Sequence, residues 1–500
     1  MVESQYGKTK KAFISPLDRL NALVYLHWSL VLHVRDLDQA IQRLTKGLCR
    51  VAEAVPYLKG RVSYPTDTSQ DGVSLTTRLV ISWGPDDPDL TFREHSMTNK
   101  LPDLATMKRE GAPAHFFSTD IISLPLFVDV SSRLPQPVFE ATYIPIEGGL
   151  VLNMCVHHGV MDGRGLATLT EMWAEATRLE NGNDAVKFPT RKLPDPDEPL
   201  TRTARLVAAA GGNKVDRSLS LEELLRRYRT DHAFGQDLMA LLSLTAAGPK
   251  CASHIFTFSG AKLEHAKEVL ARDGNLNCVI TTNSILNAVI WSSITRVRLS
   301  RRQQPWPTSV SRFSLAVDGR RRLGLAIDEP GSYLGNVVLI SSVDVPLDVL
   351  ETAGTCNFTM SACSLAPVVQ AIAKASARIT TDHISGLLSA LQQVQDSSDV
   401  GPGWLSPHRV NFMASSWANL PLYECDFGPM FSEDSPGNGP GTPVFVRYPY
   451  AEYNDGNVVV LPRRRTPAGG DEAIEVYVML AEEDLQALKK DDVFVRWLKT

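Results

Sequence analysis

Hydrophobic and polar positions change their spacing several times along the chain, and each change predicts an element. Residues 37–58 repeat apolar positions at helical spacing and predict a packed helix; one face would carry Leu37, Ile41, Leu44, Leu48 and Val51. From residue 137 the period becomes strand-like, with PVFEATYIPI and LVLNMCVHH joined by the short turn EGG, which predicts a hairpin. Helical spacing returns after Gly165, so the stretch VHHGVMDGRG at 156–165 connects a strand to a helix.

The second half of the chain mixes both periods without a strict alternation. Helical patterns occupy residues 281–298, 366–379 and 481–498. Strand-like patterns occupy residues 310–320, 335–343, 410–417, 457–465 and 472–480. This irregular order predicts an α/β protein with mixed (α+β) sheets, not a doubly wound parallel sheet.

A polar, proline-rich stretch interrupts the apolar patterns between residues 181 and 219. We interpret it as a crossover linker between an N-terminal domain at 1–180 and a C-terminal domain at 220–500. Two domains also suit a length of 500 residues, which is large for one hydrophobic core.

Composition and charge narrow the class of protein. The formal charge is −5, from 51 basic and 56 acidic residues, and no basic stripe is interleaved with aromatic residues, so we expect no nucleic-acid partner. The seven cysteines are widely spaced and odd in number, which favours free thiols over a disulfide framework. The N-terminal stretch lacks an apolar core of signal-peptide length, and the most apolar early run is too short to cross a bilayer. We therefore expect a soluble cytoplasmic protein without membrane contact.

The strand-to-helix connection carries the most reactive groups of the chain. His157 and His158 would face opposite sides of a strand, so they make a poor metal chelate, and we expect no metal. A neutral imidazole at the end of a strand suits general-base chemistry instead, and Asp162 could orient the turn. On composition alone, two ordinary turn histidines with Asp162 as a helix cap explain the motif equally well.

Other stretches of the chain resemble the same protein family as this motif. HHGVMDG resembles the HxxxDG signature of BAHD acyltransferases, which share the chloramphenicol-acetyltransferase-like fold with peptide-synthetase condensation domains. Further family-like stretches follow in the family's order: SPLDRL at 15–20, YLKGRV at 57–62, residues 281–298, VDGRRRL at 317–323, YLGNVV at 333–338 and SSWANLPLYECDFG at 415–428. The family's DFGWG is DFGPM here, which is similar to fungal members related to trichothecene O-acetyltransferases.

This resemblance implies two chloramphenicol-acetyltransferase-like domains with the active site at their interface, and it suggests roles for particular residues. His158 would be the general base, and Gly163 would leave room for ligand beside it. Asp162 would pair with an arginine and hold the loop; Arg320 is the candidate, next to Arg321 and Arg322. The other implied residues are Ser415 and Trp417 for the oxyanion and acyl group, Asp426 as a structural residue, and Thr281, Thr282, Gly335 and Asn336 beside CoA.

The implied function is an acyl-CoA-dependent O-acyltransferase of secondary metabolism, most simply one that uses acetyl-CoA as co-substrate and holds no permanent cofactor. Its acceptor would be a small-molecule alcohol or, as the alternative, an amine. The protein would be a monomer. Two alternatives stay open: a condensation-like transferase with a carrier-protein-bound donor, and a catalytically retired binding protein. The sequence does not identify the acceptor molecule. We expect the loops at 27–36, 386–406 and 432–443 to line the pocket, and their residues follow no recognisable pattern.

Overall fold

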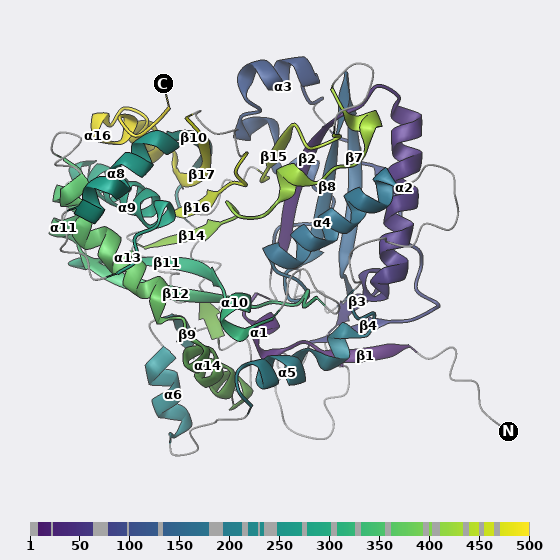
Figure 1. Ribbon diagram of the computed structural model, residues 1–500, viewed down its shortest axis with the longest axis horizontal. Coiled ribbons are helices and arrows are strands. Elements are labelled where there is room, and N and C mark those ends of the chain that lie inside the picture. Colours follow the sequence, from purple (N-terminus) through teal and green to yellow (C-terminus); the bar gives the residue numbers. More distant parts are fainter. Residues whose placement is uncertain are drawn as a thin grey trace.

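The structure is a computed structural model that describes most of the chain. The described residues are 9–21, 24–63, 79–97, 100–128, 134–179, 194–212, 219–228, 231–234, 248–272, 278–301, 308–325, 332–355, 362–393, 400–402, 411–433, 440–449, 455–464 and 471–499. Two main sheets lie in two separate halves of the molecule, with helices on their outer sides (Figure 1). The mixed α/β class predicted from the sequence is confirmed.

The first sheet has five strands in the order β15-β2-β8-β7-β5. Their bounds are Tyr25–His33 for β2, Phe92–Glu94 for β5, Phe139–Ile146 for β7, Gly149–His157 for β8 and Phe445–Arg447 for β15. The predicted hairpin is present as β7 and β8, which pair antiparallel from Ile146 opposite Gly149 onwards. Every residue of β8 is buried, which explains its continuous apolar run. The strand therefore ends, with His157, deep inside the molecule.

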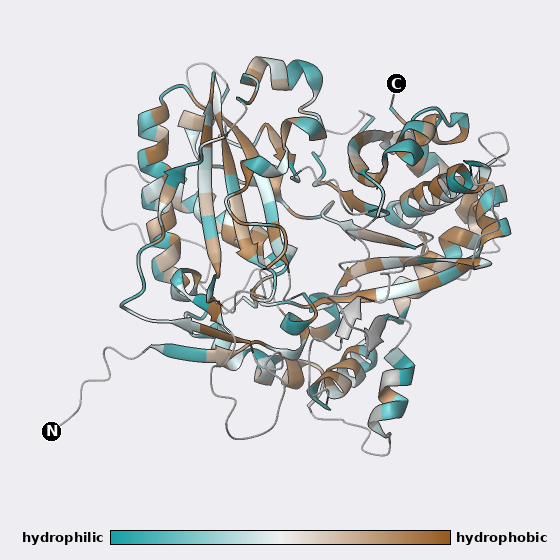
Figure 2. Cartoon of the chain, turned by 180° about the vertical axis from the view of Figure 1, so that it is seen from behind, coloured by the Kyte–Doolittle hydropathy of each residue, from teal (hydrophilic) through white to brown (hydrophobic). Residues whose placement is uncertain are grey.

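Two helices pack together beside this sheet, α2 (Leu37–Ala54) and α4 (Gly163–Arg178). The indole Nε1 of Trp173 donates a hydrogen bond to the backbone oxygen of Leu44, 2.8 Å away. Both helices match the expected periodicity, and α4 starts directly after the histidine motif. Hydrophobic residues concentrate on the strands and on the inward helix faces, while the outward faces are largely hydrophilic (Figure 2).

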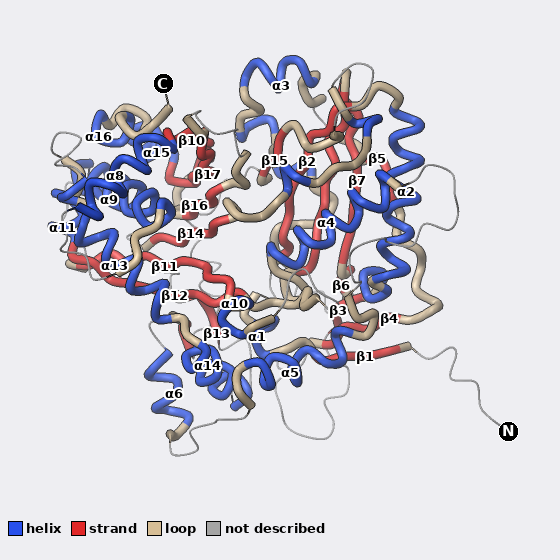
Figure 3. Tube along the Cα trace, in the orientation of Figure 1, coloured by secondary structure: helices blue, strands red, loops and turns tan. Residues whose placement is uncertain are grey.

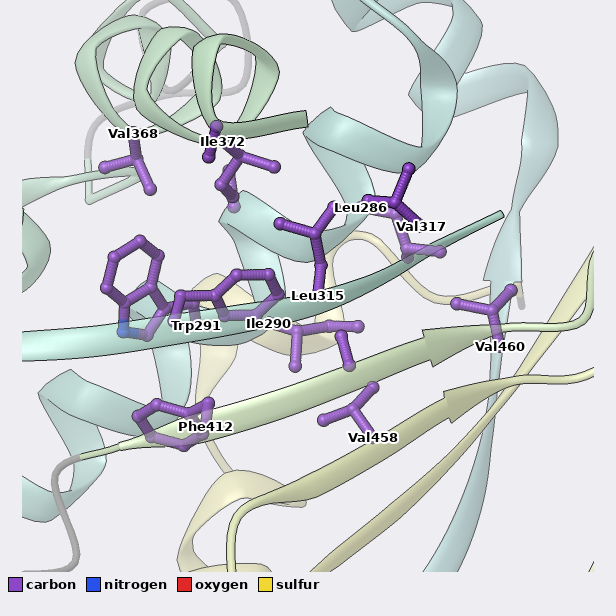
Figure 4. Close-up of a cluster of buried hydrophobic side chains, with 14 of the residues drawn as sticks. Leu286, Ile290, Trp291, Leu315, Val317, Val368, Ile372, Phe412, Val458 and Val460 are labelled. Carbon is purple, nitrogen blue, oxygen red and sulfur yellow. The ribbon is translucent and has the colours of Figure 1, made fainter. Parts of the chain in front are cut away.

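The second sheet has six strands in the order β10-β17-β16-β14-β11-β12. Their bounds are Cys251–Ser259 for β10, Val310–Asp318 for β11, Val338–Pro346 for β12, Phe412–Ser416 for β14, Asn457–Val460 for β16 and Ala473–Ala481 for β17. Strand β14 is parallel to both of its neighbours and the other pairs are antiparallel, so the sheet is mixed. Its core against α9 (Thr282–Arg301) and α13 (Ala366–Arg378) includes Trp291, Phe412 and Ile372 (Figure 4).

Smaller elements complete the fold (Figure 3). A four-stranded sheet has the order β1-β4-β3-β6, with bounds Lys10–Phe13, Val80–Trp83, Arg61–Ser63 and Gln136–Pro137, and β9 (His232–Phe234) pairs with β13 (Val400–Pro402). The other α-helices are α1 (Pro16–Arg19), α3 (Leu104–Glu110), α5 (Glu198–Ala209), α6 (Leu221–Tyr228), α8 (Gly260–Arg272), α10 (Arg320–Leu323), α11 (Leu347–Thr352), α14 (Thr381–Gln393), α15 (Glu482–Leu488) and α16 (Asp492–Val495). Short 3-10 helices cover Pro56–Lys59, Ala114–Phe116, Thr119–Ile121, Leu422–Glu424 and Pro429–Phe431.

Some expectations about the segments were wrong. The expected terminal helix is broken into α15 and α16, because the Asp491 side chain accepts a hydrogen bond from the backbone N–H of Phe494 and caps a new helix. Residues 27–33 form part of strand β2, not a pocket loop, and residues 386–393 belong to α14. Residues 394–399, 403–406 and 434–439 of the expected loops lie outside the described residues.

The expected linker contains a helix. Residues 180–193 and 213–218 lie outside the described residues, but α5 occupies the middle of the stretch and buries Glu198, Arg202 and Leu206. The division at 1–180, 181–219 and 220–500 stays a prediction. The described part of the chain contains no helix long and apolar enough to cross a membrane. No disulfide joins the cysteines that are described.

Strand β15 connects the two halves of the molecule. It comes from late in the chain, yet it pairs antiparallel with β2 of the first sheet. The fully buried Arg447 ends this strand and donates hydrogen bonds to the backbone oxygen of Ala112 at 2.6 Å and to Glu475 of β17 at 2.9 and 3.0 Å. One side chain thus ties a loop beside the first sheet to a strand of the second sheet.

Candidate active site

The site is centred on the loop that follows β8. The backbone N–H of His158 donates to the carbonyl oxygen of Val24 at 2.9 Å, and the N–H of Gly159 donates to the His157 Nδ1 at 3.1 Å. His157 is 1% exposed and packs edge-on against Tyr25, with ring centroids 5.2 Å apart. His158 is only partly buried and makes different contacts. The two neighbouring histidines therefore have different surroundings, and of the two only His158 is partly accessible.

Asp162 and Arg320 form a bidentate ion pair, as the resemblance implied. Arg320 Nη1 and Nη2 lie 2.8 and 2.9 Å from Asp162 Oδ2 and Oδ1, and both side chains are fully buried. Asp162 also caps α4 through the N–H of Gly165 at 3.0 Å, and it accepts from the N–H of Val337 at 2.9 Å. The carboxylate thus joins the motif loop and α4 to two segments of the other half of the molecule.

The environment sets the charge of these groups. Burial alone would raise the pKa of Asp162, but Arg320 and the backbone donors hold this pKa below its ordinary value. Burial lowers the pKa of His158 below 6.5, and its hydrogen bonds and the nearby carboxylates of Asp162 and Asp18 offset only part of that effect. His158 is therefore neutral at neutral pH, as a general base requires.

The sequence did not identify a second buried network beside the histidine. Asn336 Oδ1 lies 3.1 Å from His158 Nδ1, and Asn336 donates to Asp18 from both its backbone N–H and its side chain. Asp18 lies 3.5 Å from Arg202, which also pairs with Glu198 at 2.6 Å. The spacing of Glu198 and Arg202 by four residues, within a stretch interpreted as a linker, was the available signal.

Arg202 continues this network to the motif loop. It donates to the carbonyl oxygen of Val160 at 2.7 Å, and Tyr57 donates to Glu198 at 3.2 Å. The N–H of Gly335 lies 3.3 Å from the same glutamate. Buried side chains therefore support the loop at three positions: Asn336 at His158, Arg202 at Val160 and Arg320 at Asp162.

Trp417 lies at the other side of the motif. A Cβ added at Gly163 would lie 3.8 Å from Trp417 Nε1, so the indole faces the start of α4. Trp417 packs edge-on against Trp28 and Tyr448, with centroid distances of 5.7 and 5.6 Å. Ser415 is partly buried on β14, two positions before Trp417. The structure thus brings Trp417 to the motif, whereas the roles of Ser415 and Trp417 toward an acyl group stay predictions.

The Asp426 side chain holds a turn in place. Its Oδ1 accepts from the N–H groups of Gly428 and Gly441 at 2.9 and 2.7 Å, and its Oδ2 lies 3.8 Å from Arg178 at the end of α4. Gly428 has a φ of 104°, a conformation that favours glycine. This carboxylate therefore acts at the end of α4 opposite to Asp162, in a turn where proline and methionine replace the family's WG.

The four residues expected beside CoA divide into two groups. Thr281 is exposed and exchanges hydrogen bonds with Ser284 at the start of α9, and Thr282 Oγ1 lies 3.4 Å from Glu264. Gly335 and Asn336 instead lie beside the motif, where the Gly335 carbonyl accepts from Arg320 at 2.6 Å. The structure does not bring the two groups together, and a part in CoA binding stays a prediction for all four. The described residues contain no group of three or more His, Cys, Asp or Glu side chains that could hold a metal ion.

Two glycines at the start of α4 allow a matched test of this packing. A Cβ at Gly165 would lie 2.2 Å from the carbonyl oxygen of Leu334, but one at Gly163 would meet its neighbours at no less than 3.7 Å. We expect Gly165→Ala to destabilise the protein by about 1–3 kcal/mol because helix and loop must separate. Gly163→Ala should keep the wild-type melting temperature and should raise KM if ligand occupies that space. Thermal unfolding and steady-state kinetics of both variants test this, and equal melting temperatures would contradict it.

Comparisons with known proteins agree with this geometry. The model of the "Transferase family" matches residues 100–494. The chain therefore belongs to this family. The trichothecene 8-O-acetyltransferase of Fusarium sporotrichioides is 52% identical over 499 residues, which cover 100% of both chains. The protein is an O-acyltransferase. The O-acetyltransferase pboB of Aspergillus ustus is 25% identical and covers 97% of this chain and 96% of its own.

Solved structures share the fold. The Fusarium graminearum TRI101 structure in complex with coenzyme A and T-2 mycotoxin superposes with a TM-score of 0.73 at 21% identity, over 98% of this chain and 99% of that chain. Vinorine synthase superposes with a TM-score of 0.56 at 15% identity, over 98% of this chain and 94% of its own. These matches show that the chain shares its overall fold with these two solved structures.

Proposed function

We propose that the protein transfers an acetyl group from acetyl-CoA to a hydroxyl group of a trichothecene, with His158 as general base. The carrying observation is a neutral, accessible imidazole on a loop clamped by the buried Asp162–Arg320 pair, between the two halves of the molecule. The acceptor class and the 8-hydroxyl position are suggested by the relative that is 52% identical. Crystal structures of TRI101 with coenzyme A support the choice of donor.

The proposed reaction needs no acyl-enzyme. His158 takes the hydroxyl proton as the acceptor oxygen attacks the thioester carbonyl. The carbonyl oxygen gains the negative charge, and we place Ser415 and Trp417 beside it or beside the acyl group. When the carbon–sulfur bond breaks, the His158 imidazolium returns the proton to the CoA thiolate. Thr281 and Thr282 are the residues that we propose for the CoA arm, since their hydroxyls lie at a helix start.

The test uses acetyl-CoA with two trichothecene alcohols, one with a free 8-hydroxyl and one without it. We expect thiol release and a product one acetyl group heavier only with the first alcohol, and transfer at least about 100-fold slower in His158→Ala. Acetyl bound to a carrier protein serves as the alternative donor. Transfer from the carrier but not from CoA would contradict the proposal, and so would acetylation of both alcohols alike. We further propose that the protein is cytoplasmic and monomeric. Light scattering of the purified protein tests the monomeric state.

The lowered pKa of His158 predicts the pH dependence. The base form persists below pH 6.5, so kcat/KM should be level around neutral pH and fall only as pH drops through the lowered pKa. Other histidines limit the accessible range: burial lowers the pKa of His27 to about 4 and that of His157 to about 3. Because the unfolded chain binds these protons more readily, each histidine costs up to about 1.4 kcal/mol of stability per pH unit below 6.5. Melting temperatures at each pH separate the two effects, and an acid limb above pH 6.5 would contradict the prediction.

A further inference from the structure

We propose that Asp18 and Asn336 are positioning residues that hold the His158 imidazole with its proton on Nδ1, which leaves the Nε2 lone pair for the acceptor hydroxyl. This inference rests on the proposed role of His158 as general base. Three separate parts of the chain contribute, because Asp18 lies on α1, His158 follows β8, and Asn336 precedes β12. Asp18 and Asn336 are 318 residues apart in the sequence.

The orientation of the Asn336 amide follows from its neighbours. Its Nδ2 lies 2.8 Å from Asp18 Oδ1 and 2.7 Å from the carbonyl oxygen of His158. Both of these oxygens accept hydrogen bonds, so the amide nitrogen must point at them. The amide oxygen then faces His158 Nδ1 at 3.1 Å.

The tautomer of His158 follows in turn. An amide oxygen only accepts hydrogen bonds, so His158 Nδ1 must donate. A neutral imidazole carries one hydrogen, and Nε2 is therefore the basic nitrogen.

Asp18 anchors this arrangement. Its Oδ1 accepts from the backbone N–H as well as the side chain of Asn336, at 2.9 and 2.8 Å. Its Oδ2 accepts from the N–H of Ser15 at 2.9 Å and lies 3.5 Å from Arg202. Asp18 and Asn336 are both 0% exposed, so no water replaces a lost partner without rearrangement. The amide of Asn336 is thus held from two sides and cannot turn its nitrogen toward the imidazole.

Both positioning residues also make His158 a stronger base. Burial lowers its pKa, while the hydrogen bond that the imidazole donates to Asn336 and the negative charge of Asp18 raise it. Loss of either residue should therefore lower this pKa further and move the acid limb of kcat/KM to lower pH. A loss of folded protein would scale the whole profile instead and would leave the limb in place.

The experiment compares Asn336→Ala and Asp18→Asn with the matched control Asn153→Ala. Asn153 is also a buried asparagine with hydrogen bonds to Ser29 and to a backbone oxygen, but it lies in mid-strand on β8. We expect Asn336→Ala to lower kcat about 10- to 100-fold, as loss of an orienting partner of a functional histidine typically does. Asp18→Asn should lower kcat less than Asn336→Ala does. In both of these variants the acid limb of kcat/KM should shift to lower pH, whereas the acid limb of Asn153→Ala should stay where it is in the wild type.

A spectroscopic measurement separates this inference from the proposed function. In protein labelled with 15N-histidine, the His158 signals are assigned by their loss in His158→Ala. We expect an unprotonated Nε2 in the wild type and a mixture of tautomers in Asn336→Ala. A wild-type proton on Nε2, or acid limbs that stay fixed in both variants, would overturn the positioning role even if His158→Ala is inactive. Full activity of His158→Ala would instead overturn the proposed function.

Discussion

Replacing His158 with alanine is expected to lower kcat about 100- to 10,000-fold, because the variant loses the only group that we place to take the acceptor proton. Its fold should persist, since His158 is partly exposed and its backbone N–H still donates to Val24. Thiol release from acetyl-CoA with a trichothecene alcohol measures the effect, and thermal unfolding checks the fold.

The control for this variant is His254→Ala. His254 is a partly buried histidine on β10 of the other sheet, and burial lowers its pKa to about 4. This variant should keep nearly full activity. If His158→Ala also transferred acetyl at a near-normal rate with the same substrate pair, His158 would not be the base.

Removal of the Asp162 carboxylate is expected to cost about 3–5 kcal/mol of unfolding free energy, because it leaves the buried Arg320 charge without its partner. Asp162→Ala also loses the cap of α4 and the acceptor for the Val337 N–H. Urea unfolding measures the loss. Below the melting temperature, kcat should fall as well, since the loop that carries His158 is no longer clamped.

The matched control is a surface pair with the same chemistry. Arg312 and Asp344 form two hydrogen bonds of 2.7 Å, but their side chains are 28% and 40% exposed. Asp344→Ala should cost at most about 1 kcal/mol, because water replaces the lost partner. Similar losses in Asp162→Ala and Asp344→Ala would show that burial of the first pair contributes little.

Local patterns were sufficient for most of the fold. The hairpin of β7 and β8 and the helix α4 follow from the change in spacing between residues 137 and 178. The break between α15 and α16 was missed because a helical hydrophobic pattern continues across the cap at Asp491. The pairing of β15 with β2 could not be predicted, since a three-residue strand has no recognisable period.

The candidate site was only partly predictable for a related reason. The motif pointed to His158 and Asp162, and the family resemblance pointed to Arg320. The buried network of Asp18, Asn336 and Arg202 depends on contacts between residues far apart in the sequence. Asp18 lies in the family-like stretch at 15–20, Asn336 was expected beside CoA, and Arg202 lies in the expected linker. Long-range hydrogen bonds between polar side chains leave no periodic trace in a sequence, so only the structure identified them.

The strand exchange at β15 also limits how substrates reach the site. A hinge motion that separated the two sheets would have to break the pairing of β15 with β2 and the hydrogen bonds of Arg447. The two halves are therefore held together by main-chain and side-chain hydrogen bonds and are not expected to open and close about a hinge. Substrate exchange should proceed through local side-chain and loop movement. The N-terminal half expressed as a separate chain should not fold independently, because its sheet would lack strand β15.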